Sequence, residues 1–593
     1  MGVDVMKKAM PIGIDDFATV REKGYYFVDK TEEIARILDH PAQVTLFTRP
    51  RRFGKTMMLS MMKYFLTIEH AEEHRKLFEG LAIAKDAEAM AQQGMRPVLS
   101  LELKEWQFDT WEDMQKRIPE IMGEIFRSHR YLMDEASDPI DVKNFEGFLS
   151  GEKDINQCKM ALAFLLRLME AHYGKKVVLL IDEYDAPVQY AWECGYYKKA
   201  ISFFRRFLSA ALKTNLSLDF AILTGVLRIT KETIFSGLNN LQVDSLLSTT
   251  FPTLMGFTSA EVQQMAEDLG HADKMPEIQA WYDGYRIAGH EIYNPWSVLK
   301  YFKQGCVAGA YWVNTSGNSI LRNMMMHAPA TFFDSLKTVL QGGSIPAWAR
   351  DAVIYAEIYQ HPNELYTMLL TTGYLTCTQI EYTGLGPRAQ FVIPNQEILS
   401  LFRIEVLERF HAESFAIHAP ELMTSFLSGD VVRVQKGLAD YLEILASSFD
   451  VANKEAFYHG FVLGLTALLV PEYDVRSNHE SGYGRYDIAV FPKAAEQDGA
   501  VLEFKTAETE KELEAKTEEA LAQIAEKDYI AEFRARHRSG LCLWHCFLRK
   551  ACQSDVPRRQ DVSQTQVHTS IALKEVKTSF NAILSLRGGP DVI

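Results

Sequence analysis

The sequence predicts an α/β protein built from several domains, and three observations support that prediction. An apolar strand at residues 44–47 leads into a basic loop and then into a helix. A second apolar strand, at residues 177–181, ends in two acids. Near the C-terminus, apolar strands that carry acids lie between two helical stretches. Buried strands that alternate with helices are typical of α/β sheets.

The length and composition indicate a globular chain of more than one domain. At about 150 residues per domain, 593 residues suggest about four domains. Hydrophobic residues make up 47% and charged residues 24%, as in ordinary globular proteins. No apolar run reaches the ~18–20 residues that cross a bilayer, and the start has no apolar signal region. The seven cysteines form no C-x-x-C pair, which favours free thiols in a reducing compartment. We therefore expect a cytoplasmic protein without a membrane partner.

The net charge of −15 argues against a passive coat for nucleic acid, because neutralising phosphates requires clustered lysine and arginine. It does not exclude an enzyme that touches DNA locally with the help of a divalent cation. The acidic balance lowers the expectation of DNA binding without removing it.

The loop at residues 49–56, "RPRRFGKT", fits the phosphate-loop pattern G-x-x-x-x-G-K-[ST] except that Arg49 replaces the first glycine. In such loops, backbone N–H groups at a helix N-terminus hold phosphates. Gly54 would let the backbone approach closely, Lys55 would reach the β- and γ-phosphates of ATP, and Thr56 would bind Mg²⁺. The structural alternative is a basic turn before a helix. The predicted nucleotide-binding residues of this loop are Arg52, Phe53, Gly54, Lys55 and Thr56.

The strand at residues 177–181 runs into Asp182 and Glu183, which is a Walker B pattern. A buried parallel strand delivers such acids to its carboxyl edge, where α/β sheets bind ligands. We expect Asp182 to hold Mg²⁺, directly or through water, and Glu183 to orient the attacking water. The next apolar strand ends in Thr224, which could sense the γ-phosphate. Arg228 follows, either to stabilise transition-state charge or to form a structural salt bridge.

A series of motifs recurs in order along the chain from about residue 11 to about residue 530. They are "PIGIDDF", "YYFVDKT", "RPRRFGKT", "LLIDEYDAPV", "LTGVLRITKETIFSGLNNL", "WYDGYRI", "IYNPWSVLKYF", "YHGFVLGL" and "NHESGYGRYDI…LEFK". The series resembles bacterial AAA-ATPase-like proteins that carry a C-terminal PD-(D/E)XK nuclease domain, and Arg49 fits that pattern too. The resemblance implies an architecture and an active-site chemistry with ATP and Mg²⁺ as cofactors. It does not bring a biological role.

The resemblance and the local patterns together divide the chain into five segments. Thr258 or Ser259 would cap a helix of the lid, and the Asn294-Pro295 step would start another. "YLTCTQI" and "QFVIPN" predict a hairpin in the connector, where no basic recognition helix stands out. The segments are a P-loop AAA-like ATPase core (1–255), a helical lid (256–330), a winged-helix-like connector (331–440), an α/β PD-(D/E)XK nuclease-like domain (441–550) and an atypical tail (551–593).

Within the ATPase core, residues 24–40 predict a short aromatic strand and then a helix with Thr31 as a candidate N-cap. In the resemblance this element packs near the nucleotide base.

The C-terminal segment predicts a metal site on a hairpin. "GRYDIAV" places Asp487 at the start of one strand, and "LEFK" places Glu503 and Lys505 on one face of its partner. Asp487 and Glu503 could hold Mg²⁺, and Lys505 could position or deprotonate the attacking water. The alternative to a metal site is that these charged residues lie on a solvated hairpin edge. The resemblance adds further candidates around the site: Glu455, Gln523, Lys527 and Tyr529.

These features predict an ATPase coupled to a metal-dependent nuclease that acts on nucleic acid, and DNA is the expected substrate. ATP binding and hydrolysis would move the lid and connector and so present or gate the nuclease. The alternative is a regulatory NTPase switch whose nuclease-like domain only binds DNA or a protein partner. The resemblance also allows a homo-oligomer, since AAA-like ATPases often place an arginine in a neighbour's site.

The tail departs from the family. After the helix that ends near Arg536, residues 537–550 lack a strand with clean alternation, although the nuclease core requires one. Reading one permissible codon choice a nucleotide later gives I-G-R-V-F-A-Y-G-I-A-F-C-G-K, which is an apolar strand with the family's ending. The sequence therefore predicts a frameshift after about Arg536, with the core strand missing. A divergent tail with a short strand near Leu541–Phe547 is the alternative.

Overall fold

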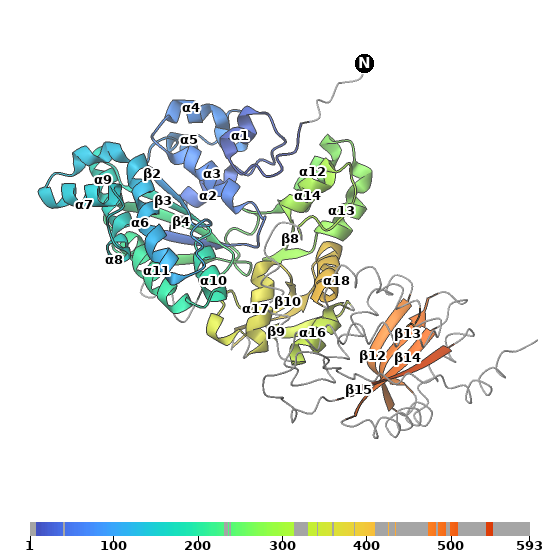
Figure 1. Ribbon diagram of the computed structural model, residues 1–593. Coiled ribbons are helices and arrows are strands. Elements are labelled where there is room, and N and C mark those ends of the chain that lie inside the picture. The colour runs from blue at the N-terminus through green and yellow to red at the C-terminus, as the bar shows by residue number, and fades with distance from the viewer. Residues whose placement is uncertain are drawn as a thin grey trace, which may run out of the picture. The chain divides into compact units, whose positions relative to one another are not determined.

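The computed structural model describes residues 8–39, 42–229, 235, 239–312, 330–340, 342–358, 361–384, 386–409, 425, 433, 473–481, 484–493, 499–507 and 541–549. The chain divides into two compact units (Figure 1). The first comprises residues 1–318, 326–329 and 338–399, and the second comprises residues 319–325, 330–337 and 400–593. No helix in these described ranges is long and apolar enough to cross a membrane.

The first unit contains a five-stranded sheet with the order β2-β3-β4-β1-β5, in which every neighbouring pair is parallel. All five residues of β1 and all six of β3 are buried, as their largely apolar sequences predict for strands covered on both faces. The predicted strands at 44–47 and 177–181, and the apolar strand predicted to end in Thr224, are confirmed. The strands of this sheet are β1 (Val44–Thr48), β2 (Val98–Glu102), β3 (Val177–Asp182), β4 (Leu218–Gly225) and β5 (Leu241–Asp244).

Helices follow and cover these strands. α3 packs against β3 and β4, while α9 packs against β3 and α11 against β4. Figure 1 shows α3 and α11 on either side of the strands. The helices of this part are α1 (Phe17–Glu22), α2 (Glu32–Asp39), α3 (Lys55–Leu66), α4 (Ala71–Arg75), α5 (Ala87–Ala91), α6 (Trp111–Ser128), α7 (Pro139–Leu149), α8 (Ile155–Cys158), α9 (Ala161–Tyr173), α10 (Ala186–Glu193) and α11 (Tyr197–Leu212).

One predicted element is wrong. Residues 25–30 form no strand, because this extended stretch has no neighbouring strand to pair with; Tyr26 makes one backbone bond, to the carbonyl of Ala9. The helix predicted after them is confirmed as α2. The hydroxyl of Thr31 accepts the amide of Ile83 from a distant turn.

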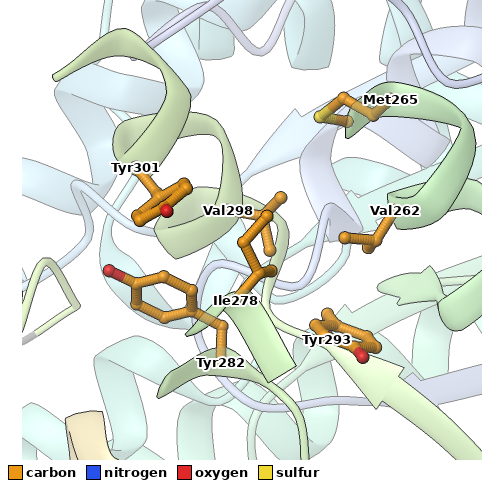
Figure 2. Packing of buried hydrophobic residues seen from close by; sticks show 7 residues of the cluster. All are labelled: Val262, Met265, Ile278, Tyr282, Tyr293, Val298 and Tyr301. Carbon is orange, nitrogen blue, oxygen red and sulfur yellow. The ribbon is translucent and has the colours of Figure 1, made fainter. Parts of the chain in front are cut away.

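The lid segment consists of helices around a small antiparallel sheet, β6-β8-β7, which the sequence did not predict. Thr258 caps α12 through a capping box with Glu261, and Asn294 caps α14, both as predicted. The elements are β6 (Phe257–Thr258), α12 (Ser259–Asp268), α13 (Met275–Tyr282), β7 (Tyr285–Ile287), β8 (His290–Tyr293) and α14 (Pro295–Lys303). Figure 2 shows the core that joins them, formed by Val262, Met265, Ile278, Tyr282, Tyr293, Val298 and Tyr301.

The connector contains the predicted hairpin, β10 paired antiparallel with β11. A third strand, β9, pairs with β11 and was not predicted. The elements of this segment are α16 (Ala330–Leu340), β9 (Ile345–Trp348), α17 (Pro362–Thr372), β10 (Thr376–Thr383), β11 (Gly386–Val392) and α18 (Gln396–Arg409).

The second unit has a four-stranded sheet with the order β12-β13-β14-β15. Its first three strands pair antiparallel, as the sequence predicts. The strands are β12 (Tyr473–Ser481), β13 (Gly484–Pro492), β14 (Gly499–Ala507) and β15 (Leu541–Arg549). The helices expected at 453–470 and 511–533, with Glu455, Gln523, Lys527 and Tyr529, lie outside the described residues, as does the tail at 551–593.

The prediction that the sheet lacks its next core strand is wrong. β15 pairs with β14 in parallel along nine residues, from Gly499↔Leu541 to Ala507↔Arg549. The segment reads "LCLWHCFLR", and its largely apolar run of leucine, tryptophan, phenylalanine and cysteine is typical of strands in parallel sheets even without period-two alternation. A frameshift after Arg536 therefore remains a prediction about the gene, and it no longer has a missing strand to support it.

Candidate functional site

The phosphate loop ends at Gly54, the N-cap of α3, which has φ +88° and ψ +19° in the left-handed region. A Cβ built on Gly54 meets nothing within 4 Å, so backbone conformation rather than crowding favours glycine here. Because Gly54 has no side chain, the first-turn amides of the twelve-residue helix α3 receive no side-chain cap. Uncapped amides at a helix N-terminus are an arrangement that can bind an anion.

Lys55 lies within this loop rather than in solvent, and its side chain is only 3% exposed. Its ammonium donates to the carbonyls of Arg49 at 3.3 Å and Pro50 at 3.2 Å. Its Nζ also lies 3.6 Å from Oε1 of Glu183. The lysine therefore joins the phosphate loop to the acid predicted to orient water.

Glu183 has φ +51°, a left-handed conformation that is uncommon for a residue with a Cβ. Such strain costs of order 1 kcal/mol or more and collects at functional sites. Arg52 in the phosphate loop also has a positive φ, +67°. The loop predicted to bind phosphate and the loop predicted to orient the attacking water thus both contain a non-glycine residue with positive φ.

Asp182 receives two hydroxyl groups from different elements. Thr56 Oγ1 on α3 donates to its Oδ2 at 2.6 Å, and Thr224 Oγ1 on β4 donates to its Oδ1. β4 lies between β1 and β3, which explains why Thr224 reaches Asp182. Burial raises the pKa of Asp182, as does the neighbouring charge of Glu183, while the two hydroxyls and Lys55 act in the opposite direction.

A further acid, which we did not predict, lies beside Asp182. Glu102 ends β2 and pairs in register with Asp182 on β3. Burial and then the charge of Asp182 raise the pKa of Glu102. The signal in the sequence was present: Glu102 follows an apolar strand, as Asp182 does.

These oxygen groups fit a hard divalent cation, which prefers carboxylates, hydroxyls and water. In the described part of the chain, no three acidic, histidine or cysteine side chains converge to hold a metal by themselves. Mg²⁺ usually takes one or two carboxylates and completes its shell with water and substrate phosphates. Asp182 with Thr56 matches that smaller donor set.

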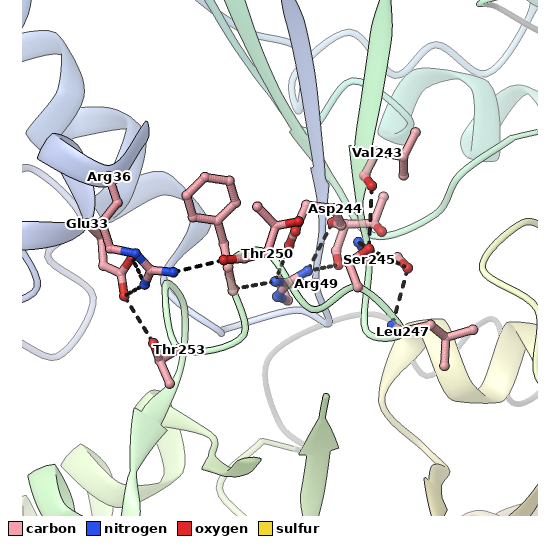
Figure 3. A network of polar contacts seen from close by, with 12 residues as sticks. Glu33, Arg36, Arg49, Val243, Asp244, Ser245, Leu247, Thr250 and Thr253 are labelled. Atoms are coloured by element: carbon pink, nitrogen blue, oxygen red, sulfur yellow. Dashed lines mark hydrogen bonds and ion pairs between the residues drawn. The ribbon is translucent and has the colours of Figure 1, made fainter. Parts of the chain in front are cut away.

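Arg49, at the position of the missing glycine, is fully buried, and its guanidinium points toward Asp244 (Figure 3). Its Nη2 donates to Oδ1 of Asp244 at 2.6 Å and to the carbonyl of Phe251 at 2.9 Å. Its Nη1 donates to the carbonyls of Thr48 and Asp244, both at 3.0 Å. Burial lowers the pKa of Arg49, and the carboxylate of Asp244 opposes that effect. The arginine therefore ties the end of β1 to the end of β5.

The lid segment contacts the phosphate loop through backbone groups. The amide of Gly256 donates to the carbonyl of Phe53 at 2.9 Å. The indole of Trp312 donates to the carbonyl of Arg51 at 3.2 Å. The guanidinium of Arg52 lies 4.2 Å from the ring centre of Trp296 on α14, a cation–π distance. Arg52 and Phe53, both predicted to bind nucleotide, thus also contact the lid.

Arg228 pairs with Asp351 of the connector at 3.2 Å, and both side chains are about one third exposed. The amide of Val353 donates to the carbonyl of Arg228 at 2.9 Å. The structural salt bridge that the sequence left open for Arg228 is thus observed.

Asp185, which the sequence motifs did not single out, anchors the loop that leads to Arg228. Its carboxylate accepts the amides of Val226 and Leu227. Burial, with the charge of Glu183 as the next cause, raises the pKa of Asp185 to about 7. A Cβ on Gly225 would lie 2.5 Å from Oδ1 of Asp185, so the close approach of these two loops requires glycine.

Glu397 at the start of α18 forms a second buried polar centre. It is fully buried, accepts the hydroxyl of Ser297 at 2.8 and 3.0 Å, and accepts the amide of Trp312 at 2.8 Å. Burial raises its pKa to about 7. Since Trp312 also donates to the carbonyl of Arg51, Glu397 is two contacts away from the phosphate loop. No local pattern reveals this, because Ser297 lies 100 positions away.

The second unit holds the backbone of the predicted metal hairpin. Asp487 lies in β13, while Glu503 and Lys505 lie in β14. These strands pair in the antiparallel register Val490↔Ala500, Ala489↔Val501, Ile488↔Leu502. The next residues along the two strands are Asp487 and Glu503, so the register brings their backbones to neighbouring positions.

Two parts of the chain match known protein families. Residues 11–235, which include the phosphate loop and β3, match the family described as predicted AAA-ATPase. Residues 453–552, which include β12 to β15, match the PD-(D/E)XK nuclease superfamily. The chain carries an AAA-ATPase-like domain and a PD-(D/E)XK nuclease superfamily domain.

A relative from Azotobacter chroococcum mcd 1 has a similar extent. It is described as an uncharacterized protein in the vnfD 5' region, and the two are 27% identical over 544 residues. The alignment covers 89% of this chain and 94% of the relative. The match to the nuclease superfamily runs through β15, the strand that we expected to be missing.

Proposed function

We propose that the protein binds and hydrolyses ATP in its AAA-ATPase-like domain and couples this to Mg²⁺-dependent cleavage of nucleic acid, DNA in the first place, by its nuclease superfamily domain. The observation that carries the proposal is the convergence of Lys55, Thr56 and Asp182 at the carboxyl edge of a parallel sheet, beside uncapped helix amides. Both domain matches support it.

In the ATPase domain, the first-turn amides of α3 and the ammonium of Lys55 bind the phosphates. Thr56 and Asp182 would hold Mg²⁺, which when bound neutralises phosphate charge. Glu183 orients the attacking water, because its carboxylate lies beside Lys55 where a γ-phosphate would be held. Thr224 keeps Asp182 oriented and links the site to β4.

The contacts around the phosphate loop offer a route from nucleotide to connector. The carbonyls of Arg51 and Phe53 accept hydrogen bonds from Trp312 and Gly256 of the lid, respectively. A change in the conformation of the loop on phosphate binding therefore alters both hydrogen bonds. Trp312 is in turn held by Glu397 of α18. Residues after α18 belong to the second compact unit, so α18 is the natural element to carry the change onward.

In the nuclease domain, Asp487 and Glu503 would hold Mg²⁺ and Lys505 would assist the attacking water. The β13–β14 register supports this assignment, because it brings the backbones of the two acids to neighbouring positions. A regulatory NTPase whose nuclease-like domain only binds DNA or a partner is the alternative, and cleavage assays separate the two. Purified protein is incubated with plasmid and with single-stranded DNA, with and without Mg²⁺ and ATP. Cleavage that requires Mg²⁺ supports the nuclease, whereas binding without cleavage supports the switch.

The ATPase assignment is tested by two variants that should fail differently. Lys55→Ala should abolish tight ATP binding, because the phosphates lose their ammonium partner. Glu183→Gln should keep binding and lose hydrolysis by about 10²-fold or more. Lys63→Ala is the matched control, an exposed lysine on the same helix α3. Turnover at the wild-type rate in Glu183→Gln, or unchanged affinity in Lys55→Ala, would refute the assignment.

A further inference from the structure

A surface pocket of about 430 Å³ lies on the ATPase domain where α6, α8 and α11 meet. Its apolar base includes Ile155 and Phe203, which are 5% and 1% exposed. Figure 1 shows the three helices next to one another on the side of the sheet that carries α11. The remaining lining residues are polar or aromatic: Trp111, Asn156, Lys159, Lys198, Lys199 and Ser202.

The three lysines of this pocket have no acidic partner among the described residues, in a chain whose net charge is −15. Nearby acids bind other groups. Asp113 accepts the hydroxyl of Thr110, and Asp109 accepts that of Tyr190. Asp154 caps the first turn of α8 through its own helix amides. The positive charge of the pocket is therefore left uncompensated by the protein.

The rim is also rich in hydrogen-bond donors. Nζ of Lys159 donates to Oδ1 of Asn156 at 2.7 Å, which uses the acceptor of that side chain and leaves its NH₂ group. Lys198 and Lys199 lie in the first turn of the sixteen-residue helix α11, whose start has no acid and no side-chain cap. Cations at a helix N-terminus are unfavourable unless an anion is present. The pocket is thus built for a ligand with negative charge.

Trp111, the first residue of α6, adds a partly exposed aromatic surface to this charge. Nζ of Lys199 lies 5.9 Å from the centre of its ring, at the limit of a cation–π contact. A nucleotide has a phosphate, which the lysines can bind, and a planar base, which can stack on the aromatic ring. Grooves that bind single strands pair lysines with stacking aromatics in the same way.

We propose that this pocket binds a nucleotide unit of single-stranded nucleic acid, with the base against Trp111 and the phosphates against Lys159, Lys198 and Lys199. The pocket opens near the carboxyl edge of the sheet, because α6 follows the end of β2 and the hydroxyl of Tyr196 ties the start of α11 to the carbonyl of Phe108 at 2.5 Å. A strand held there touches the domain that hydrolyses ATP. The inference rests on the proposed action on nucleic acid and gives the ATPase domain its own contact with that substrate.

The test uses the full-length protein in EDTA and without ATP, so that neither cleavage nor hydrolysis affects it. A short oligothymidylate with one 5-iodouracil is crosslinked by ultraviolet light, and the modified peptide is mapped by mass spectrometry. We expect the crosslink on the peptide that contains Trp111, and Trp111→Ala should abolish it. Crosslinks that map only to other peptides would overturn the proposal.

Charge reversal measures the phosphate contacts separately. In Lys159→Glu/Lys198→Glu/Lys199→Glu, the slope of log K against log salt should fall by about 2, as expected for three lost contacts to a single strand. The control Lys76→Glu/Lys85→Glu/Lys143→Glu changes the charge equally at exposed lysines outside the pocket. Thermal melts verify that both variants fold. A salt slope equal in the two variants would overturn the proposal even if the crosslink were lost.

Free thymidine monophosphate identifies the source of the nucleotide. If it competes away the Trp111 crosslink as well as the oligonucleotide does, the pocket takes a free nucleotide, and the proposal of a bound strand is overturned. If only the strand competes, the pocket takes nucleic acid. Failure of both the crosslink and the salt response would refute the proposal for this pocket. It would leave the ATPase and nuclease assignments untouched, because those depend on Lys55 and Glu503.

Discussion

The candidate site around Asp182 and the candidate site on the β13–β14 hairpin are assembled in different ways. At the loop, Asp182 receives Thr56 from 126 positions earlier and Thr224 from 42 positions later. Only a correctly ordered parallel sheet can make these contacts. At the hairpin, Asp487 and Glu503 lie on strands that are consecutive in the chain, and the register brings their backbones to neighbouring positions. The first proposed site therefore depends on contacts between distant segments, and the second depends on the register of two consecutive strands.

This difference predicts that the two activities can be removed independently. Glu503→Ala should reduce Mg²⁺-dependent cleavage by about 10⁴-fold, because a metal ligand is lost, while ATP hydrolysis continues at its normal rate. Gel assays of plasmid cleavage and phosphate-release assays measure the two on the same preparation. Asp474→Ala is the matched control, since Asp474 is an acid of the same sheet that pairs with Arg476 on its own strand.

Cleavage that survives in Glu503→Ala, or in EDTA, would place the nuclease chemistry elsewhere. Loss of ATP hydrolysis together with cleavage would show that the hairpin also supports the ATPase domain, and the contrast between the two sites would fail.

We expect the largest effect of a long-range contact on stability at Arg49, which pairs with Asp244. Arg49→Met should destabilise the protein by about 3–5 kcal/mol, because it leaves the carboxylate of Asp244 buried without its partner. Arg52→Met in the same loop should cost only about 0.5–1 kcal/mol, the value of a cation–π contact with Trp296. Urea unfolding of the full chain compares the two. Equal losses would mean that Arg49 is not the anchor of β5.

The sequence predicted the residues whose chemistry is encoded locally. Lys55, Thr56 and Asp182 follow apolar strands at fixed offsets, so their place at the carboxyl edge of a parallel sheet could be expected from the pattern of residues alone. Arg49 could not be placed in this way, because its partner Asp244 ends a strand 195 positions away that carries no motif.

Glu397 escaped prediction for the same reason. A glutamate near the start of a helix usually faces water and favours the macrodipole, and only tertiary packing buries this one against Ser297 and Trp312. The strand β15 was missed because we required alternation, whereas strands of parallel sheets often read as continuous apolar runs. Long-range packing, rather than local pattern, decided each of these cases.

Glu397 gives the sharpest test of the connection between the phosphate loop and α18. Burial raises its pKa from the ordinary 4.5 to about 7. Below pH 4.5 the folded and unfolded chains are both protonated at this residue, so burial carries no ionisation penalty. As the pH rises toward 7 the unfolded chain ionises first, and the wild type loses stability. Glu397→Gln has no such loss.

The free energy of unfolding of Glu397→Gln, relative to wild type, should therefore rise by about 3 kcal/mol between pH 4.5 and pH 8. Urea unfolding followed by tryptophan fluorescence at several pH values measures it, and Glu291→Gln, a glutamate that pairs with Arg286 at the surface, is the control that should show little slope. If Glu397 also positions Trp312 on the phosphate loop, Glu397→Ala should weaken ATP binding more than Glu397→Gln, since glutamine still accepts the amide of Trp312. Equal ATP affinity in the two variants would disconnect α18 from the loop, and a pH-independent stability difference would show that Glu397 is charged in the fold.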